Sequence, residues 1–266
     1  MHIIKYILAA VIVCAASQAY GQVMIGHRGS LWGVENTTQA FVNGAQRGYE
    51  GLECDIRATA DSHFVICHDS DFERVGGPDT PIASMSVEQA LAVELSQTRE
   101  GTQYTASPIL LEDFLDICIE HDVIPVVEIK SCWNLYSSSK DSEDYCYDGI
   151  PALLQIIADK GLSDRVVIIS FMAGVIDKIR ALYPAVQLQF LLGSNADWHS
   201  YEQWCIDNRL DIDAHYSLVT DEMVAAFHAA GLRVNAWTVD SPDEFARLQA
   251  LGVDMVTTNK LPATSH

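Results

Sequence analysis

The chain has 266 residues, of which 49% are hydrophobic and 20% are charged, so it is long enough to form one large domain with a sizeable core. Its 16 Lys and Arg residues against 36 Asp and Glu residues give a formal net charge of −20. This charge argues against nucleic acid or an anionic membrane surface as the main partner, because both would repel it. A small-molecule partner remains compatible.

The N-terminal segment has the features of an export signal. Lys5 precedes an apolar stretch that is short for a membrane span, and small residues follow it in "ASQAYG". Cleavage after Ala19 or after Gly21 fits the small-residue rule equally well, and a lipid anchor on Cys14 is a weaker alternative. We therefore expect residues 1–21 to be the signal peptide of a periplasmic or extracellular protein without a stable membrane anchor.

Strand-like apolar runs alternate with amphipathic helical patterns along the rest of the chain. The expected strands cover residues 23–27, 51–56, 123–130, 165–171, 186–192, 210–216, 233–239 and 253–258. The expected helices cover residues 36–47, 110–121, 149–160, 173–183, 198–208, 220–230 and 241–250. Three of these helices are expected to begin at the capping residues Asn36, Thr220 and Ser241.

The alternation of strands and helices predicts parallel strands joined by right-handed crossovers. Eight strands close a barrel, so a (β/α)8 TIM barrel over residues 22–266 is the first expectation. A doubly wound open sheet is the alternative, and the absence of glycine-rich nucleotide-binding loops weakens it. Residues 69–109 are expected to form a small insertion after the second strand region.

Six cysteines follow the expected signal peptide, and disulfides become plausible in an oxidising compartment. If the turn in "ATADS" is centred between residues 60 and 61, Cys54 lies opposite Cys67 and could form a disulfide with it. Free buried thiols are the alternative. Cys132 and Cys146 bracket a long polar loop, which a second disulfide would pin.

Five chemically active side chains lie where the first three barrel strands are expected to end. His27 ends the first strand, Glu53 and Asp55 end the second, and Glu128 and Lys130 end the next. Strand ends meet at the C-terminal face of a barrel, and alternation places each pair on one face of its strand. Three carboxylates in one mouth would repel one another without a divalent cation. All-oxygen ligation favours Ca²⁺ or Mg²⁺ over Zn²⁺.

Five sequence segments together carry a resemblance to a known family. These are "IGHRG", "ENTTQAF", "GLECDIRATADSHFVICHD", "VVEIK" and "NAWTVD", in this order from residue 24 to about residue 260. In this combination the chain resembles the glycerophosphodiester phosphodiesterase family of phosphatidylinositol-phospholipase-like TIM barrels. The resemblance implies metal-dependent hydrolysis of small-molecule glycerophosphodiesters to sn-glycerol 3-phosphate and an alcohol.

The resemblance also implies roles for individual residues. The implied metal ligands are Glu53, Asp55 and Glu128, the implied acid and base are His27 and His68, and the implied substrate-binding residues are Arg28, Lys130, Trp237 and Glu35. The attacking group is expected to be a glycerol hydroxyl, which would form a cyclic phosphate that water then opens. Which histidine is the acid and which is the base stays open, as does the choice between Ca²⁺ and Mg²⁺.

Two alternatives accompany this interpretation, and the chain departs from the family at Val34 and in the loop over residues 131–148, while the insertion over residues 69–109 matches the place where the family carries an extra lobe. A phospholipase D-like or sphingomyelinase D-like lipid phosphodiesterase would use the same fold, and a noncatalytic barrel could bind a phosphodiester. Val34 stands where the family usually has a proline, which should alter the stiffness of the loop. The acidic loop over residues 131–148 and the insertion over residues 69–109 would both border the substrate.

Overall fold

The computed structural model describes residues 22–130 and 149–263. The expected signal peptide and the expected disulfide between Cys132 and Cys146 lie outside these residues. No helix within them is long and apolar enough to cross a membrane.

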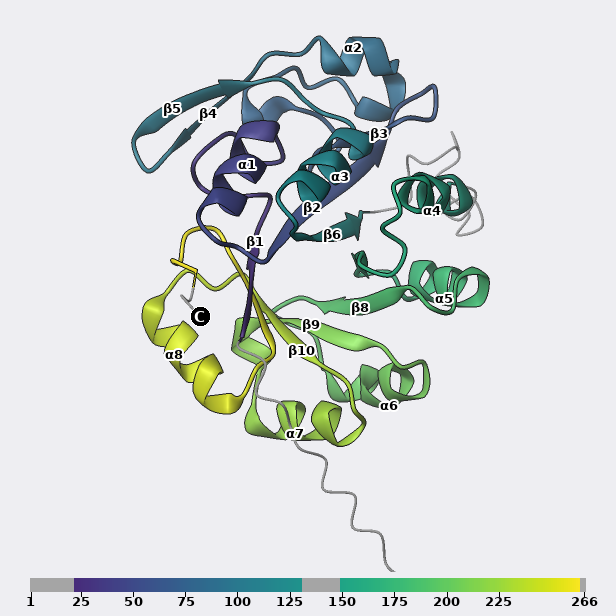
Figure 1. The fold of residues 1–266 in the computed structure, drawn as a ribbon, viewed down its shortest axis with the longest axis vertical. Coiled ribbons are helices and arrows are strands. Elements are labelled where there is room, and N and C mark those ends of the chain that lie inside the picture. Colours follow the sequence, from purple (N-terminus) through teal and green to yellow (C-terminus); the bar gives the residue numbers. More distant parts are fainter. Residues whose placement is uncertain (1–21, 131–148, 264–266) are drawn as a thin grey trace, which may run out of the picture.

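Parallel strands form a closed barrel at the centre of the molecule (Figure 1). In spatial order from β1, the sheet runs β1-β11-β10-β9-β8-β7-β6-β2, and pairing of β1 with β2 closes it. The strands are β1 (Val23–Gly26), β2 (Gly51–Ala58), β6 (Ile124–Ile129), β7 (Val167–Ser170), β8 (Gln187–Leu192), β9 (Asp211–His215), β10 (Val234–Trp237) and β11 (Met255–Thr258). The TIM-barrel prediction is therefore confirmed, and the open sheet is excluded.

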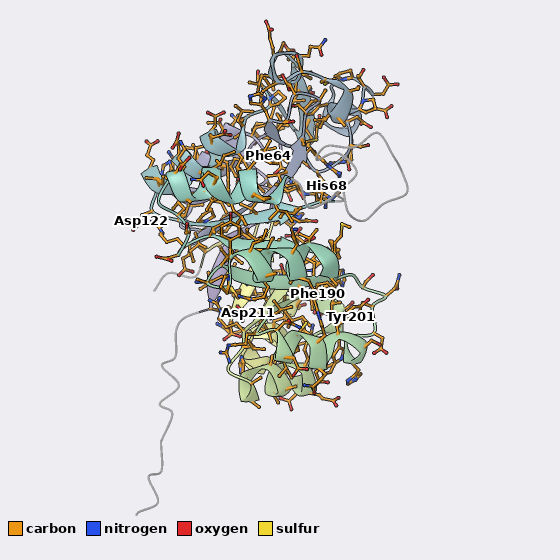
Figure 2. All side chains as sticks on the ribbon, turned by 90° about the vertical axis from the view of Figure 1, so that its right-hand side faces the viewer. Phe64, His68, Asp122, Phe190, Tyr201 and Asp211 are labelled. Carbon is orange, nitrogen blue, oxygen red and sulfur yellow. The ribbon has the colours of Figure 1, made fainter. Side chains whose placement is uncertain are left out.

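Helices surround the barrel on its outer side (Figure 1). They are α1 (Thr38–Gln46), α3 (Leu111–Glu120), α4 (Ile150–Asp159), α5 (Ala173–Leu182), α6 (His199–Asp207), α7 (Asp221–Ala229) and α8 (Pro242–Leu251). Their bounds and those of the barrel strands agree with the predicted ranges to within two residues. Buried apolar side chains such as Phe190 of β8 fill the layer between helices and strands. At the edge of this layer the partly exposed Tyr201 of α6 covers Phe190, with ring centroids 4.9 Å apart (Figure 2).

The helix caps confirm one prediction and correct another. The Thr220 side chain caps α7 by accepting a hydrogen bond from the backbone N–H of Met223 at 3.2 Å. Ser241 stands at the N-cap of α8 without a side-chain bond. The prediction that Asn36 caps α1 is wrong, because the N-cap is Thr37. Asn36 has a φ of 59°, and its side chain bonds instead to Asp55 of β2.

A small lobe leaves the barrel between β2 and α3. It contains β3 (Phe64–Ile66), the short helices η1 (Glu73–Val75), η2 (Ile82–Ser84) and α2 (Val87–Leu91), and the hairpin of β4 (Leu95–Arg99) and β5 (Thr102–Ala106). The lobe lies beside α1 and β2, at the top of Figure 1. It has an apolar core of its own, which includes Phe72, Val75 and Ile82.

The predicted disulfide between Cys54 and Cys67 is wrong, since both residues are free and buried. The antiparallel strands β2 and β3 pair Ile56 with Ile66 and Ala58 with Phe64, a register shifted by one residue from the predicted one. A shift of one residue turns a side chain to the other face of a strand. Cys54 accordingly joins the core beneath the helices, while Cys67 joins the core of the lobe.

Candidate active site

A sharp turn after β1 places the first site residues. Arg28 has a φ of 50° and Gly29 a φ of 89°, and a Cβ added to Gly29 would come within 2.6 Å of the Ala40 backbone. Only glycine fits that position without strain. The backbone N–H of Arg28 donates a hydrogen bond to Oε2 of Glu53 at 2.8 Å. The turn therefore fixes His27 and Arg28 at the mouth of the barrel, against β2.

Glu53 and Asp55 in the middle of β2 and Glu128 near the carboxyl end of β6 form a buried acidic trio. Each offers an oxygen that lies within 4.8 Å of the others. Oε1 of Glu53 and Oδ1 of Asp55 are buried and accept no hydrogen bond from the described residues. Buried carboxylates without such partners are costly, and a divalent cation would satisfy both oxygens. The donor set therefore fits one Ca²⁺ or Mg²⁺ ion, with oxygens from all three residues.

The electrostatics of the trio are asymmetric. Burial and the neighbouring carboxylates raise the pKa values of Glu53 and Glu128. Burial acts in the same direction on Asp55, but the positive charges of Arg28 and Lys130 hold the pKa of Asp55 below its usual range. Asp55 is thus the residue most firmly kept as a carboxylate. A bound cation would favour the ionised form of the other two.

Two basic side chains border the trio. Nε of Arg28 lies 3.4 Å from Oδ2 of Asp55, and Nη1 of Arg28 lies 2.8 Å from Oε1 of Glu35. Nζ of Lys130 lies 2.8 Å from Oε1 of Glu128 and 3.4 Å from Oδ1 of Asp55. The Arg28 and Lys130 side chains also line the cavity beside the trio. They can therefore interact with an anionic group that enters it.

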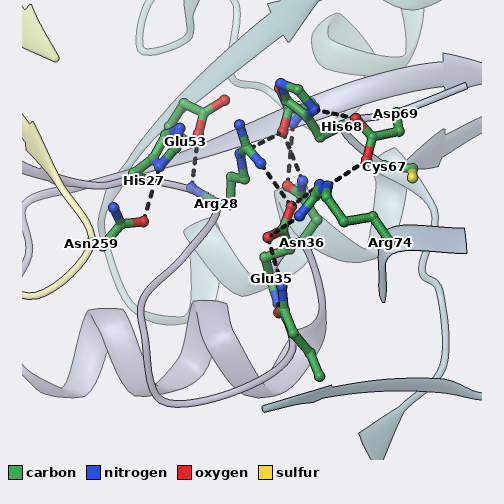
Figure 3. Close-up of polar contacts among 12 residues, drawn as sticks. His27, Arg28, Glu35, Asn36, Glu53, Cys67, His68, Asp69, Arg74 and Asn259 are labelled. Atoms are coloured by element: carbon green, nitrogen blue, oxygen red, sulfur yellow. Dashed lines mark hydrogen bonds and ion pairs between the residues drawn. The ribbon is translucent and has the colours of Figure 1, made fainter. Parts of the chain in front are cut away.

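The hydrogen bonds of His27 determine its tautomer (Figure 3). Asn259 donates from Nδ2 to Oδ2 of Asp240 at 2.7 Å, and a carboxylate can only accept. The amide oxygen of Asn259 therefore faces Nδ1 of His27, 3.0 Å away, and Nδ1 donates to it. Burial lowers the pKa of His27 to about 4. The ring is thus neutral, with an unprotonated Nε2.

His68 has a different partner from His27. Its Nδ1 lies 2.7 Å from Oδ1 of Asp69, so the ring donates to a carboxylate rather than to an amide. Burial lowers the pKa of His68, and the charge of Asp55 and the bond to Asp69 act against that shift. Of the two histidines, His68 is the one whose partner stabilises a protonated ring.

A cavity of about 140 Å³, partly open to solvent, joins these groups. Its walls are His27, Arg28, Glu53, His68, Glu128, Lys130, Ile169, Phe171, Leu191, Asp213, Trp237 and Thr257. Seven of the nine predicted site residues are among them. The other two, Asp55 and Glu35, lie behind Arg28 and contact it.

One wall of the cavity is apolar and aromatic. The Trp237 ring stands edge-on to Phe171, with centroids 5.6 Å apart, and its Nε1 donates to the Asp213 carbonyl at 3.1 Å. The His215 ring stands edge-on to Trp237, with centroids 5.5 Å apart, and is not part of the cavity wall. Trp237 can therefore cover the apolar side of a ligand whose anionic group is bound on the opposite, polar side.

Sequence reasoning missed Asp213, a buried acid on β9 in the cavity wall. Its Oδ1 accepts no hydrogen bond from the described residues. Burial and the charge of Glu128 raise the pKa of Asp213 well above its usual range. The sequence pattern could have indicated Asp213 as a site residue, since it interrupts an apolar strand in the same way as Glu53 and Asp55 do.

The substitution Asp213→Asn is expected to stabilise the protein at alkaline pH. Because the pKa of Asp213 is higher in the folded state, the wild type loses stability as pH rises above the unfolded pKa. Thermal melts should give a Tm above that of the wild type by about 2–4 °C at pH 8, and no difference near pH 4. A Tm difference that does not change with pH would contradict this assignment.

Comparisons with known proteins show the family of the chain. The model of the glycerophosphoryl diester phosphodiesterase family matches residues 25–262. A glycerophosphodiester phosphodiesterase of Caldanaerobacter subterraneus subsp. tengcongensis is 24% identical, over 89% of this chain and 93% of that protein.

Solved structures share the fold. A phosphodiesterase of Oleispira antarctica, in complex with the product sn-glycerol-3-phosphate, has a TM-score of 0.75 and 19% identity, covering 89% of this chain and 92% of that one. A glycerophosphodiester phosphodiesterase of Parabacteroides distasonis has a TM-score of 0.73 and 22% identity, covering 90% of this chain and 92% of that one.

Proposed function

The chain belongs to the glycerophosphoryl diester phosphodiesterase family, and from this premise we propose how it hydrolyses glycerophosphodiesters to sn-glycerol 3-phosphate and an alcohol. The proposal is a reaction that uses one divalent cation and the acid–base pair His27 and His68. The observation that carries it is the buried trio of carboxylates, with the two differently bonded histidines beside it on one cavity.

Glu53, Asp55 and Glu128 would hold the cation, since their oxygens converge and Oε1 of Glu53 is buried with no hydrogen-bond donor among the described residues. When bound, Ca²⁺ or Mg²⁺ would neutralise charge on the nonbridging phosphate oxygens and acidify a coordinated hydroxyl. Arg28 and Lys130, at the same cavity, would bind the phosphate. Their charges would stabilise the extra negative charge of the transition state.

The hydrogen-bond partners support one assignment of the two histidines. Nε2 of His27 is unprotonated and would take the proton of a glycerol hydroxyl as that oxygen attacks phosphorus. His68, bonded to the Asp69 carboxylate, would protonate the leaving alkoxide as its bond to phosphorus breaks. The product of this step is a cyclic phosphate. Water then opens it with the two proton transfers reversed.

Export remains part of the proposal. The apolar segment and the small residues within positions 1–21 support it, and both lie outside the described residues. The formal net charge of −20 supports a small-molecule substrate rather than a nucleic acid. A periplasmic and an extracellular location both fit.

Product analysis distinguishes this function from its alternatives. The protein is incubated with glycerophosphocholine, lysophosphatidylcholine and sphingomyelin in Ca²⁺ or Mg²⁺, and glycerol 3-phosphate and free choline are measured. We expect both products from glycerophosphocholine and no reaction with the two lipids. Cyclic phosphate formed from the lipids would favour the lipid phosphodiesterase, and folded protein without any reaction would favour a noncatalytic binding barrel.

A further inference from the structure

Arg74, which belongs to the lobe, connects two carboxylates that reach different parts of the site (Figure 3). From η1 its Nε donates to Oδ2 of Asp69 at 2.6 Å. Its two terminal nitrogens donate to the oxygens of Glu35 at 2.9 and 2.7 Å. One guanidinium therefore makes three charge-assisted hydrogen bonds to two acids, which is a geometry that a single lysine ammonium does not reproduce.

Each of these two acids also holds a residue of the cavity wall. Asp69 accepts from Nδ1 of His68 at 2.7 Å through its other oxygen. Glu35 accepts from Nη1 of Arg28 at 2.8 Å. The chain of contacts thus runs from His68 through Asp69, Arg74 and Glu35 to Arg28, without a gap.

Glu35 is the more deeply buried of the two acids, at 6% exposed. A carboxylate at that depth needs several donors, and Glu35 receives them from Arg28, Arg74 and Gln97. Gln97 lies on β4 of the lobe and also accepts the backbone N–H of Glu35 at 3.1 Å. The lobe therefore supplies two of the three side chains that hold Glu35.

We propose that Arg74 is a positioning residue of the reaction, which orients His68 through Asp69 and orients Arg28 through Glu35. The inference rests on the proposed function, in which His68 protonates the leaving group and Arg28 binds the phosphate. It assigns to the lobe a part in both the protonation of the leaving alcohol and the binding of the phosphate. Arg74 itself does not line the cavity.

Two substrates that differ in their leaving group distinguish a positioning role of Arg74 from a merely structural one. Wild type and Arg74→Met are compared on glycerophosphoethanolamine and on the p-nitrophenyl ester of glycerol 3-phosphate. The alkoxide of the first needs a proton to leave, whereas p-nitrophenolate leaves without one. Because His68 also acts when water opens the cyclic phosphate formed from either substrate, kcat is measured here as the maximal rate of alcohol release in a single turnover. We expect Arg74→Met to lower kcat by about 10²-fold on the first substrate and by less than about 5-fold on the second. KM should rise about 10-fold on both, because Arg28 loses its support.

Two further variants separate the two arms of the network. Asp69→Asn should reproduce the selective loss of kcat without the rise in KM. Because Asp69 is partly exposed, Asp69→Asn is expected to fold, and it tests the proposal even if Arg74→Met does not fold. Gln97→Met is the matched control from the same lobe, since Gln97 contacts Glu35 but not Asp69 in any bond of the described residues. It should raise KM on both substrates and leave their kcat ratio unchanged.

Equal losses of kcat on the two substrates in Arg74→Met and in Asp69→Asn would overturn the proposal, as would a change of the kcat ratio in Gln97→Met. These outcomes leave the proposed function standing, because they concern variants only. Failure of the wild type on both substrates would instead remove the function on which the inference rests.

Discussion

Replacement of His27 by alanine is expected to lower kcat for glycerophosphocholine by about 10³- to 10⁴-fold, at the upper end of what general acid–base catalysis contributes. The unprotonated Nε2 of His27 is the proposed acceptor of the proton from the attacking hydroxyl, and Asn259 and Asp240 fix that tautomer. Steady-state kinetics give kcat, and a thermal melt shows whether the variant is folded.

His63→Ala is the matched control for this prediction. His63 lies in the turn between β2 and β3, is half-exposed and has only Asp61 as its ion-pair partner among the described residues. It does not line the cavity. Its loss should change kcat by less than about 2-fold, as is usual for a surface substitution. If folded His27→Ala kept more than a tenth of the wild-type kcat, the assignment of His27 as base would be wrong.

Glu128→Gln is expected to lower activity by about 10³-fold, because loss of one ligand removes several kcal/mol of cation-dependent stabilisation of the transition state. The shape of the side chain is kept, so the fold should survive. The same variant should lose the response of Tm to added cation. In the wild type, cation at about 100 times its Kd adds about 2.7 kcal/mol of stability, which corresponds to a Tm rise of about 5–10 °C.

Asp213→Asn is the control for the loss of a ligand. Asp213 is a buried acid in the same cavity but is not one of the three converging carboxylates. Its variant should keep the full rise of Tm with Ca²⁺ or Mg²⁺. A Glu128→Gln protein that still showed that rise would place the cation elsewhere and would remove Glu128 from the proposed ligand set.

The positions of the site residues at strand ends could be predicted from the sequence, because the hydrophobic periodicity locates each strand and the order of strands and helices gives the fold. The barrel strands are apolar on both faces and separated by helices, so a polar residue at a carboxyl end falls at the mouth. That reasoning brought together His27, Glu53, Asp55, Glu128 and Lys130, all of which lie at or immediately behind the cavity.

The hairpin register could not be predicted in the same way. β2 and β3 are buried on both faces, so the apolar pattern did not tell one register from the next. Ser62 has a φ of 69° in the connecting turn, and the pairing of Ala58 with Phe64 follows that turn. The one-residue difference separated Cys54 from Cys67.

The residues that support the histidines were missed because their contacts are long-range. Asn259 bonds to His27 from the far end of the sequence, and Asp240 bonds to Asn259. Arg74 of the lobe bonds to Asp69, the partner of His68. Polar residues of this kind look like ordinary loop side chains in the sequence. Only the closure of β1 on β11 and the position of the lobe bring them to the site.

The most direct test of the central claim is the rate of glycerol 3-phosphate release from glycerophosphocholine by metal-stripped protein, measured in excess EDTA and then with Ca²⁺ or Mg²⁺ added. The proposed site predicts a rate at least about 10³-fold lower in EDTA, restored by one or both cations. That result would also identify the preferred cation. Hydrolysis at the full rate in excess EDTA would contradict the account, because Glu53, Asp55 and Glu128 would then have no cation to hold.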